Sequence, residues 1–366
     1  ILKQIDENHK GLKAARLEKE AQHIGAKTGL MPKNPTISYG YFPGSNPVTG
    51  TKQLYVLNQE LDFPTKYISQ FKKANLRQEI IQNEYELKRQ KILLEAQMLL
   101  IDFVFISKMI GENESRMQNA EKINQLYDKQ LEFGNVSILE VNKIKSLLLI
   151  ISTKNNKARQ KLDLIRSDLI SLNGGQELSL ATLDYSQTEM KSLDELKAAY
   201  ISQHPKLKQM SLNSEMADYN IRISKQGWLP DLLFAYQSEL EPGGSYSGFQ
   251  AGISIPLWNN RKETKSAIAF SVSSESKYLD FEFSLISELE SRYKAAQNLK
   301  LLLNNFTESI SVVSNLDYLD KALDSGEYSI IEYINEMSYS YELVDIYLET
   351  QMEYYKLMTK INAVNL

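Results

Sequence analysis

Long stretches without a helix-breaking residue make up most of the chain. Leu61–Met109 contains one proline, Pro64, near its start, where a first helical turn tolerates proline. Val136–Leu172 and Ile331–Ala363 contain neither glycine nor proline. Because these runs exceed the roughly 8–20 residues of a typical globular helix, we predict long helices packed as coiled coils.

The last of these runs carries a heptad pattern. It holds two series of residues spaced seven apart: Ile334, Tyr341, Leu348 and Tyr355, and Met337, Val344, Gln351 and Met358. This is an a/d-like seam over about three heptads, which we interpret as helix packing. A capping box, Ser192-Leu-Asp-Glu195, predicts the start of another helix.

Four short segments follow a period of two, with aromatic or aliphatic residues on one face and mostly polar residues on the other. They are Pro35–Phe42, Gln53–Phe63, Asp231–Leu240 and Ser247–Leu257. Alternation of this kind over about ten residues predicts β-strands. The turn-rich loops between them predict that the strands form two hairpins.

The two halves of the chain have the same plan. Pro64 and Pro256 end the second strand of each hairpin, Gly134 and Gly326 lie in later breaks, and both pairs are 192 positions apart. The residues after each glycine also match, since both segments fit the pattern Gly-x-x-Ser-Ile-Φ-Glu, where Φ is an aliphatic residue. We therefore predict two structural repeats. The first is residues 1–173, with a hairpin at 35–63 and a tip near 134; the second is residues 192–366, with a hairpin at 230–257 and a tip near 326; residues 174–191 connect them.

Composition narrows the classes of function. The formal net charge is −4, so nucleic acid is not an expected partner. There is no cysteine, and the three histidines lie far apart, so we expect no metal site. No nucleotide-binding or hydrolase motif occurs, and we expect neither a catalytic residue nor a cofactor. The most apolar stretch, Ile92–Ile110, carries three charged residues and does not read as a membrane-spanning helix.

Several motifs, taken in order, resemble those of the TolC-type outer-membrane efflux channels, also called outer membrane factors. They are the junctions Leu61–Thr65 and Ile253–Leu257, the strand entry Trp228–Leu232, and the tip segments Phe133–Val141 and Ser325–Asn335. The resemblance covers essentially the whole chain in register. It includes Asp62-Phe-Pro-Thr65, which is similar to the heavy-metal-efflux branch of the family.

The resemblance implies a mainly α protein with β-strands that forms a homotrimer. Four strands are too few to close a barrel, and three chains would supply twelve. A 12-stranded transmembrane β-barrel would then stand in the lipid of the bacterial outer membrane, on a long α-helical barrel that extends into the periplasm. Residues 174–191 would lie in an equatorial belt. The implied function is a passive exit duct, served by a periplasmic adaptor and an inner-membrane pump.

The family has a narrow periplasmic entrance lined by acidic residues after each tip glycine. The matching positions are Glu140 and Glu332; Asn335 replaces a further acidic residue, and Tyr328 replaces a basic one. Rings of carboxylates would favour cations and raise one another's pKa. The alternative is that both glutamates are solvated residues near helix N-termini.

Two further groups of residues are predicted from the resemblance. The tips that would dock the adaptor are Phe133, Gly134 and Asn135, and Ser325, Gly326 and Glu327. The aromatic residues at or beside strand ends, predicted to lie at the membrane interface, are Tyr39, Tyr41, Tyr55, Phe234, Tyr236, Phe249 and Trp258. The simpler alternatives are plain helix turns for the first group and core packing for the second.

The sequence leaves the cargo open among metal cations, small molecules and secreted polypeptide, the last as in a type I secretion exit channel. A soluble structural or interaction protein built on coiled coils is the alternative from another class.

Overall fold

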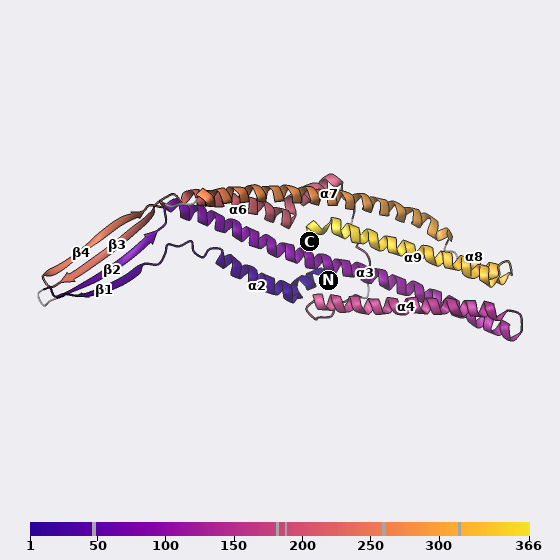
Figure 1. Cartoon of the computed structure of the whole chain (residues 1–366). Coiled ribbons are helices and arrows are strands. Elements are labelled where there is room, and N and C mark those ends of the chain that lie inside the picture. Colours follow the sequence, from indigo (N-terminus) through magenta and orange to yellow (C-terminus); the bar gives the residue numbers. More distant parts are fainter. Residues whose placement is uncertain (46–48, 181–182, 187–188, 258–260, 314–315) are drawn as a thin grey trace. The chain divides into compact units, whose positions relative to one another are not determined.

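The computed structural model describes residues 1–366 except 46–48, 181–182, 187–188, 258–260 and 314–315. The elements follow a similar order in both halves of the chain (Figure 1). In the first half they are α1 (Leu2–Asn8), α2 (Lys10–Gly25), β1 (Thr36–Pro43), β2 (Thr51–Leu61), α3 (Pro64–Glu132) and α4 (Ile138–Leu172). In the second half they are α5 (Leu193–Gln203), α6 (Pro205–Gln226), β3 (Asp231–Glu241), β4 (Gly244–Ser254), α7 (Arg261–Val313), α8 (Leu316–Asp324), α9 (Ile330–Ile361) and a 3₁₀ turn (Ala363–Asn365).

The long helices predicted from breaker-free runs are confirmed, and α3 extends over 69 residues with Pro64 in its first turn. The capping box at Ser192 is also present, since the backbone N–H of Glu195 donates to Ser192 Oγ at 3.3 Å. In the seam of α9, Ile334, Met337, Leu348 and Met358 are buried.

The chain divides into two compact units that do not follow the repeats. The first unit comprises Ile1–Ala14, Lys88–Gln203 and Leu285–Leu366, and the second comprises Ala15–Leu87 and His204–Ser284. Each unit therefore takes segments from both halves of the sequence.

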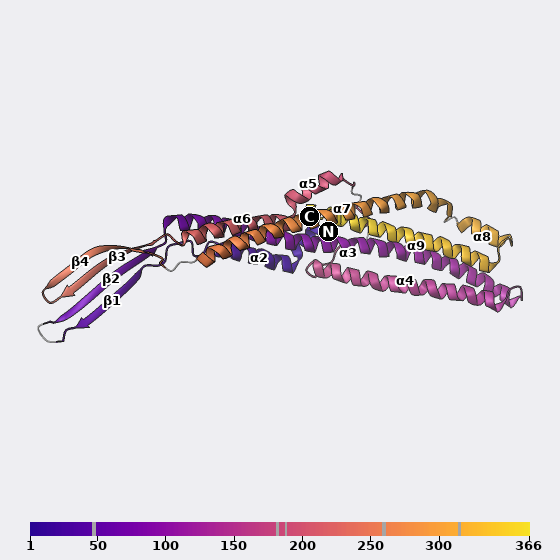
Figure 2. The ribbon, with the colours of Figure 1, turned by 45° about the horizontal axis from the view of Figure 1, so that its top comes forward.

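The second unit contains one antiparallel sheet with strand order β1-β2-β3-β4, visible in Figure 2. The two predicted hairpins are confirmed, and they join because β2 pairs with β3 from Gln53–Leu240 to Leu61–Leu232. Glu241 pairs with Gly244, which leaves a two-residue turn between β3 and β4. The predicted bounds of this strand were wrong at both ends: β4 begins at Gly244 rather than Ser247 and stops at Ser254, so Ile255–Leu257 lies outside it. Pro256 lacks the N–H that a continued ladder would need.

The helices of the second unit pack through a small core in which Leu76 and Ile80 of α3 meet Leu212 of α6. The residues from the two halves of the sequence are brought together here by the i, i+4 spacing of buried positions on α3.

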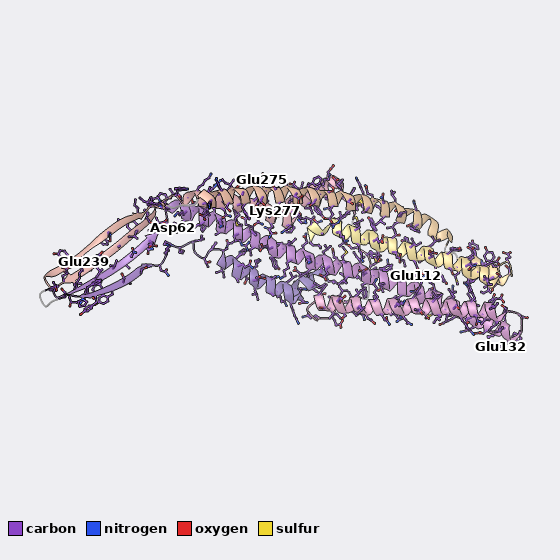
Figure 3. All side chains as sticks on the ribbon, in the orientation of Figure 1. Asp62, Glu112, Glu132, Glu239, Glu275 and Lys277 are labelled. Atoms are coloured by element: carbon purple, nitrogen blue, oxygen red, sulfur yellow. The ribbon has the colours of Figure 1, made fainter. Side chains whose placement is uncertain are left out.

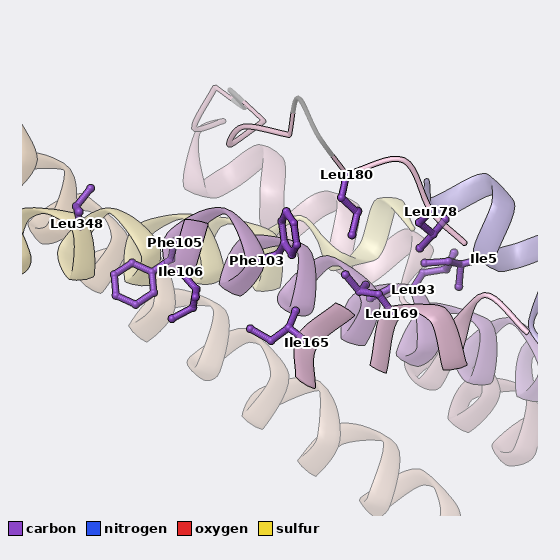
Figure 4. Close-up of a cluster of buried hydrophobic side chains, with 11 residues drawn as sticks. Ile5, Leu93, Phe103, Phe105, Ile106, Ile165, Leu169, Leu178, Leu180 and Leu348 are labelled. Atoms are coloured by element: carbon purple, nitrogen blue, oxygen red, sulfur yellow. The ribbon is translucent and has the colours of Figure 1, made fainter. Parts of the chain in front are cut away.

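The main core of the first unit gathers α3, α4 and the segment that connects the repeats (Figure 4). Phe103 and Ile106 of α3 belong to the same cluster as Leu169 of α4, and Leu178 and Leu180 come from the connection. The described part of the connection is irregular, as predicted, and two of its leucines anchor it in this core.

Candidate membrane surface and helical tips

One face of the four-stranded sheet is mainly apolar, and most of its large side chains are exposed. The cross-strand register places the following residues on this apolar face: Ile37, Tyr39, Tyr41, Tyr55, Leu57, Leu61, Leu232, Phe234, Tyr236, Leu240, Phe249, Ala251 and Ile253. Phe249 is 91% exposed and Ile37 is 80% exposed. Exposed apolar side chains scattered singly are normal in proteins, but a contiguous face of this kind marks an interaction surface.

The predicted interface aromatics pair across neighbouring strands. The rings of Tyr39 and Tyr55 lie 5.0 Å apart, and those of Tyr236 and Phe249 lie 5.2 Å apart. The prediction that these residues lie at or beside strand ends was wrong for Tyr236 and Phe249, which occupy the centres of β3 and β4. Trp258, predicted with them, lies outside the described residues.

The opposite face of the sheet is mainly polar, and its charges pair with one another. Lys52 Nζ lies 2.7 Å from a Glu239 carboxylate oxygen and 3.0 Å from one of Glu241. At the other end of the strands, Lys66 of α3 donates to Asp231 at 2.6 Å. Glu239 is labelled on the sheet in Figure 3. The two faces therefore differ in chemistry: most of the large apolar side chains lie on one face, and the charged residues of the strands lie on the other.

Both tips are the same compact turn. After α3 and after α8, a glycine with positive φ ends the helix: Gly134 at +74° and Gly326 at +76°. In each tip the backbone N–H of the residue after the glycine donates to the carbonyl five residues earlier. Asn135 donates to Gln130 at 3.0 Å, and Glu327 donates to Ala322 at 2.9 Å. This is a Schellman ending, for which glycine is preferred because it has no Cβ. The predicted helix turns at both tips are confirmed.

We expect Gly134→Ala and Gly326→Ala to loosen the tips. An alanine at positive φ costs about 1–2 kcal/mol, which corresponds to roughly five- to thirty-fold faster amide exchange in the last turn of the preceding helix. Gly111→Ala is the matched control, because Gly111 lies inside α3 with nothing near its Cβ position. Alanine there should leave exchange unchanged or slower. Equal effects at Gly111 and the tips would contradict this account.

Glu140 and Glu332 close identical capping boxes directly after the tips. The N–H of Ser137 donates to Glu140 at 2.7 Å, and the N–H of Ser329 donates to Glu332 at 2.9 Å. Donation from these serines holds the pKa of both carboxyls below the usual value for glutamate. Within one chain, therefore, the carboxylates cap helix N-termini, which is the simpler of the two roles predicted for them.

The remaining predicted tip residues are exposed. Asn335 lies on an exposed face of α9, Tyr328 lies in the turn before this helix, and Phe133 is 78% exposed. Behind the turns, a core joins the four tip helices of the first unit. In it Tyr333 donates to Asp320 of α8 at 2.6 Å.

Sequence reasoning missed one buried ion pair in the first unit. Arg116 of α3 is 4% exposed, and its Nη1 lies 2.7 Å from a carboxylate oxygen of Asp345 in α9. The guanidinium also lies 4.6 Å from the centre of the Tyr341 ring, and burial raises the pKa of Tyr341 to about 12. Charges are frequent along these helices, so nothing in the sequence singles out this arginine; the position of Asp345 beside the seam residue Val344 was the one available signal.

Neither a metal-binding cluster nor a membrane-spanning helix occurs among the described residues. No group of three or more histidine, aspartate or glutamate side chains there is placed to hold a metal ion. Among the helices as described, none is long and apolar enough to cross a lipid bilayer.

Solved structures of outer-membrane channels are similar to this structure, although no family model and no curated protein matches the sequence. A membrane protein from Pseudomonas aeruginosa and the outer-membrane channel OprN each match with a TM-score of 0.84 and 12% identity, over 99% of this chain and 88% of theirs. The outer membrane protein VceC from Vibrio cholerae matches with a TM-score of 0.82 and 12% identity, over 99% of this chain and 94% of its own. The chain therefore has the fold of these channels, and the predicted mainly α fold with antiparallel strands is confirmed.

Proposed function

We propose that the protein is a passive, trimeric exit duct of a tripartite efflux system in a bacterial outer membrane. One observation carries the proposal: a sheet with an exposed apolar face, a polar opposite face and two edge strands, β1 and β4. Lipid would cover the apolar face and so remove its apolar surface from water, which is favourable. The edges need partners there, because unpaired backbone groups are unfavourable in hydrocarbon.

A trimer meets both needs. Pairing β4 of one chain with β1 of the next would close twelve strands into a barrel and leave no edge. The polar face would then line a water-filled lumen, and Tyr39, Tyr41, Tyr55, Phe234, Tyr236 and Phe249 would contact lipid. The similarity to outer-membrane channels over 99% of the chain supports this assembly.

The periplasmic adaptor would bind at the helical tips. Phe133, Ile138 and Leu139 are large apolar residues exposed around the turn between α3 and α4, and an adaptor would cover them. With Gly134, Asn135, Ser325, Gly326 and Glu327 they form the proposed docking surface. An inner-membrane pump would supply the energy, because the chain shows no nucleotide-binding motif.

The native mass of the detergent-extracted protein tests the assembly. The proposal predicts a species of three chains of 41.9 kDa that requires detergent to remain in solution. A monomer or dimer that stays dissolved without detergent would instead support the alternative of a soluble coiled-coil scaffold.

The proposed constriction consists of Glu140 and Glu332 in three-fold rings, with Tyr328 and Asn335 beside them. Glu140→Gln with Glu332→Gln removes the charges but retains the capping boxes, because glutamine also serves at this position. We expect cation selectivity in planar bilayers, measured as the reversal potential in a salt gradient, to fall several-fold in the double variant. Glu132→Gln, at the end of α3 and outside the capping boxes, is the control. Unchanged selectivity in the double variant would place the constriction elsewhere.

The charge of this constriction favours cations, either metal ions or small organic molecules. A heavy-metal cargo would agree with the Asp62-Phe-Pro-Thr65 segment. Loss of selectivity for divalent metal over potassium in the same double variant would support metal; equal loss for all cations would support a wider range of cargo, including polypeptide.

A further inference from the structure

Two helices, one in each half of the chain, begin at a histidine. α2 starts directly after His9, and α6 starts directly after His204. In both, Nδ1 of the imidazole accepts a hydrogen bond from the backbone N–H three residues later, from Leu12 at 3.1 Å and from Leu207 at 3.4 Å. Serine, threonine, asparagine and aspartate usually fill this position, so the use of histidine twice is unusual.

Each cap is built into its surroundings. Leu12 and Leu207 are both only 1% exposed, so the capped turns are anchored in packed regions. A Cβ at Gly11 would lie 2.8 Å from the His9 ring, so the absence of a side chain at Gly11 leaves room for this ring. The ring of His204 packs beside Phe281 of α7, with centroids 5.8 Å apart.

The capping bond requires neutral imidazole. A nitrogen that accepts a hydrogen bond carries no proton, and protonation converts it to a donor that faces another donor. The imidazolium would also place a positive charge at the positive end of the helix dipole. Histidine is the side chain whose charge changes most readily between pH 5 and 8.

The charged groups around His204 do not favour its protonation. Lys206 and Lys208 lie on its own helix, and α7 contributes the uncharged Phe281 ring. Glu84 of α3 accepts a hydrogen bond from the side chain of Gln209 in α6 at 2.9 Å. Burial lowers the pKa of His204.

His9 differs from His204, because it is also the C-cap residue of α1, where a positive charge is favourable. Lys10 and Lys13 follow it on α2. Asp6 of α1 is held by Arg89 of α3 at 2.9 Å. The neighbouring Asn8 donates to the uncharged side chains of Asn173 and Gln176.

We propose that His204 makes the first turn of α6 acid-sensitive, so that this turn loosens as the pH falls below about 6.5. Above this pH the imidazole of His204 is neutral and the cap is complete. Below it, the open form binds the proton more tightly than the capped form, because burial lowers the pKa of the capped His204, and the stability of the turn falls with pH. The inference concerns one local cap and does not depend on the channel function.

Hydrogen–deuterium exchange of the full-length protein in detergent tests this, with rates corrected for intrinsic exchange. At pH 5.5 relative to pH 7.5, we expect about five-fold less protection at Leu207, as for the loss of one cap. His204→Asn should retain protection at both pH values, because asparagine caps without titrating. His23→Asn is the matched control, since His23 lies in the last turn of α2 and should leave the acid effect unchanged.

Two results would overturn the proposal. One is equal protection of this turn at both pH values in the wild type. The other is an acid effect of the same size in the His204→Asn variant. His204→Ser provides a second non-titrating cap, and far-UV circular dichroism verifies that each variant is folded.

Discussion

Phe249→Arg is expected to prevent stable insertion of the protein into lipid. Phe249 is the most exposed residue of the apolar face and lies at the centre of β4. An arginine facing lipid near the bilayer midplane costs about 2–4 kcal/mol per chain, and all three chains of the proposed trimer would carry it. We expect at least a hundred-fold fewer insertion events in planar bilayers.

Gln250→Arg is the matched control. Gln250 is the next residue in the same strand, it is also exposed, and it points to the polar face of the sheet. Arginine there would be in the lumen and in water, and insertion should continue at close to the wild-type rate. Equal behaviour of the two variants, whether both insert or both fail, would contradict the assignment of the faces.

Arg116→Met is expected to lower the free energy of unfolding by about 3–5 kcal/mol, because it leaves the half-buried carboxylate of Asp345 without its main partner. Lys154, 3.6 Å from the same carboxylate, compensates only in part. The double variant Arg116→Met/Asp345→Leu should recover most of the loss, since a well-packed apolar pair can replace a buried ion pair. Urea unfolding in detergent, followed by tyrosine fluorescence, measures the difference.

Arg159→Met provides the comparison within the first unit, where α3 contributes one residue to each ion pair. Arg159 of α4 pairs with Glu114 of α3, but both side chains are exposed. An exposed pair contributes about 0–1 kcal/mol, so this variant should remain close to the wild type. A loss at Arg159 as large as that at Arg116 would show that burial is not what makes the Arg116 pair important.

The sequence was sufficient for the strands, the long helices and the tips, because each depends on local chemistry. Period-two alternation predicted all four strands, and the repeated Gly-x-x-Ser-Ile-Φ-Glu pattern predicted both tips. The error at the end of β4 has a local cause too: Ile255 and Leu257 continue the alternation, but Pro256 between them cannot continue the ladder.

The parts that could not be predicted depend on partners distant in the sequence. Arg116 is buried because α9 brings Asp345 to it from 229 residues away. Tyr236 and Phe249 form a pair in mid-sheet because the two-residue turn sets their register, which composition alone does not reveal. The roles of Glu140 and Glu332 beyond their own capping boxes depend on neighbouring chains.

Single-channel recording of the purified wild-type protein in a planar bilayer, without pump or adaptor, tests the central claim most directly. A trimeric exit duct predicts discrete conductance steps of uniform size from a detergent-solubilised preparation. A protein that remains in solution without detergent and never conducts would contradict the channel account and leave a coiled-coil scaffold in its place.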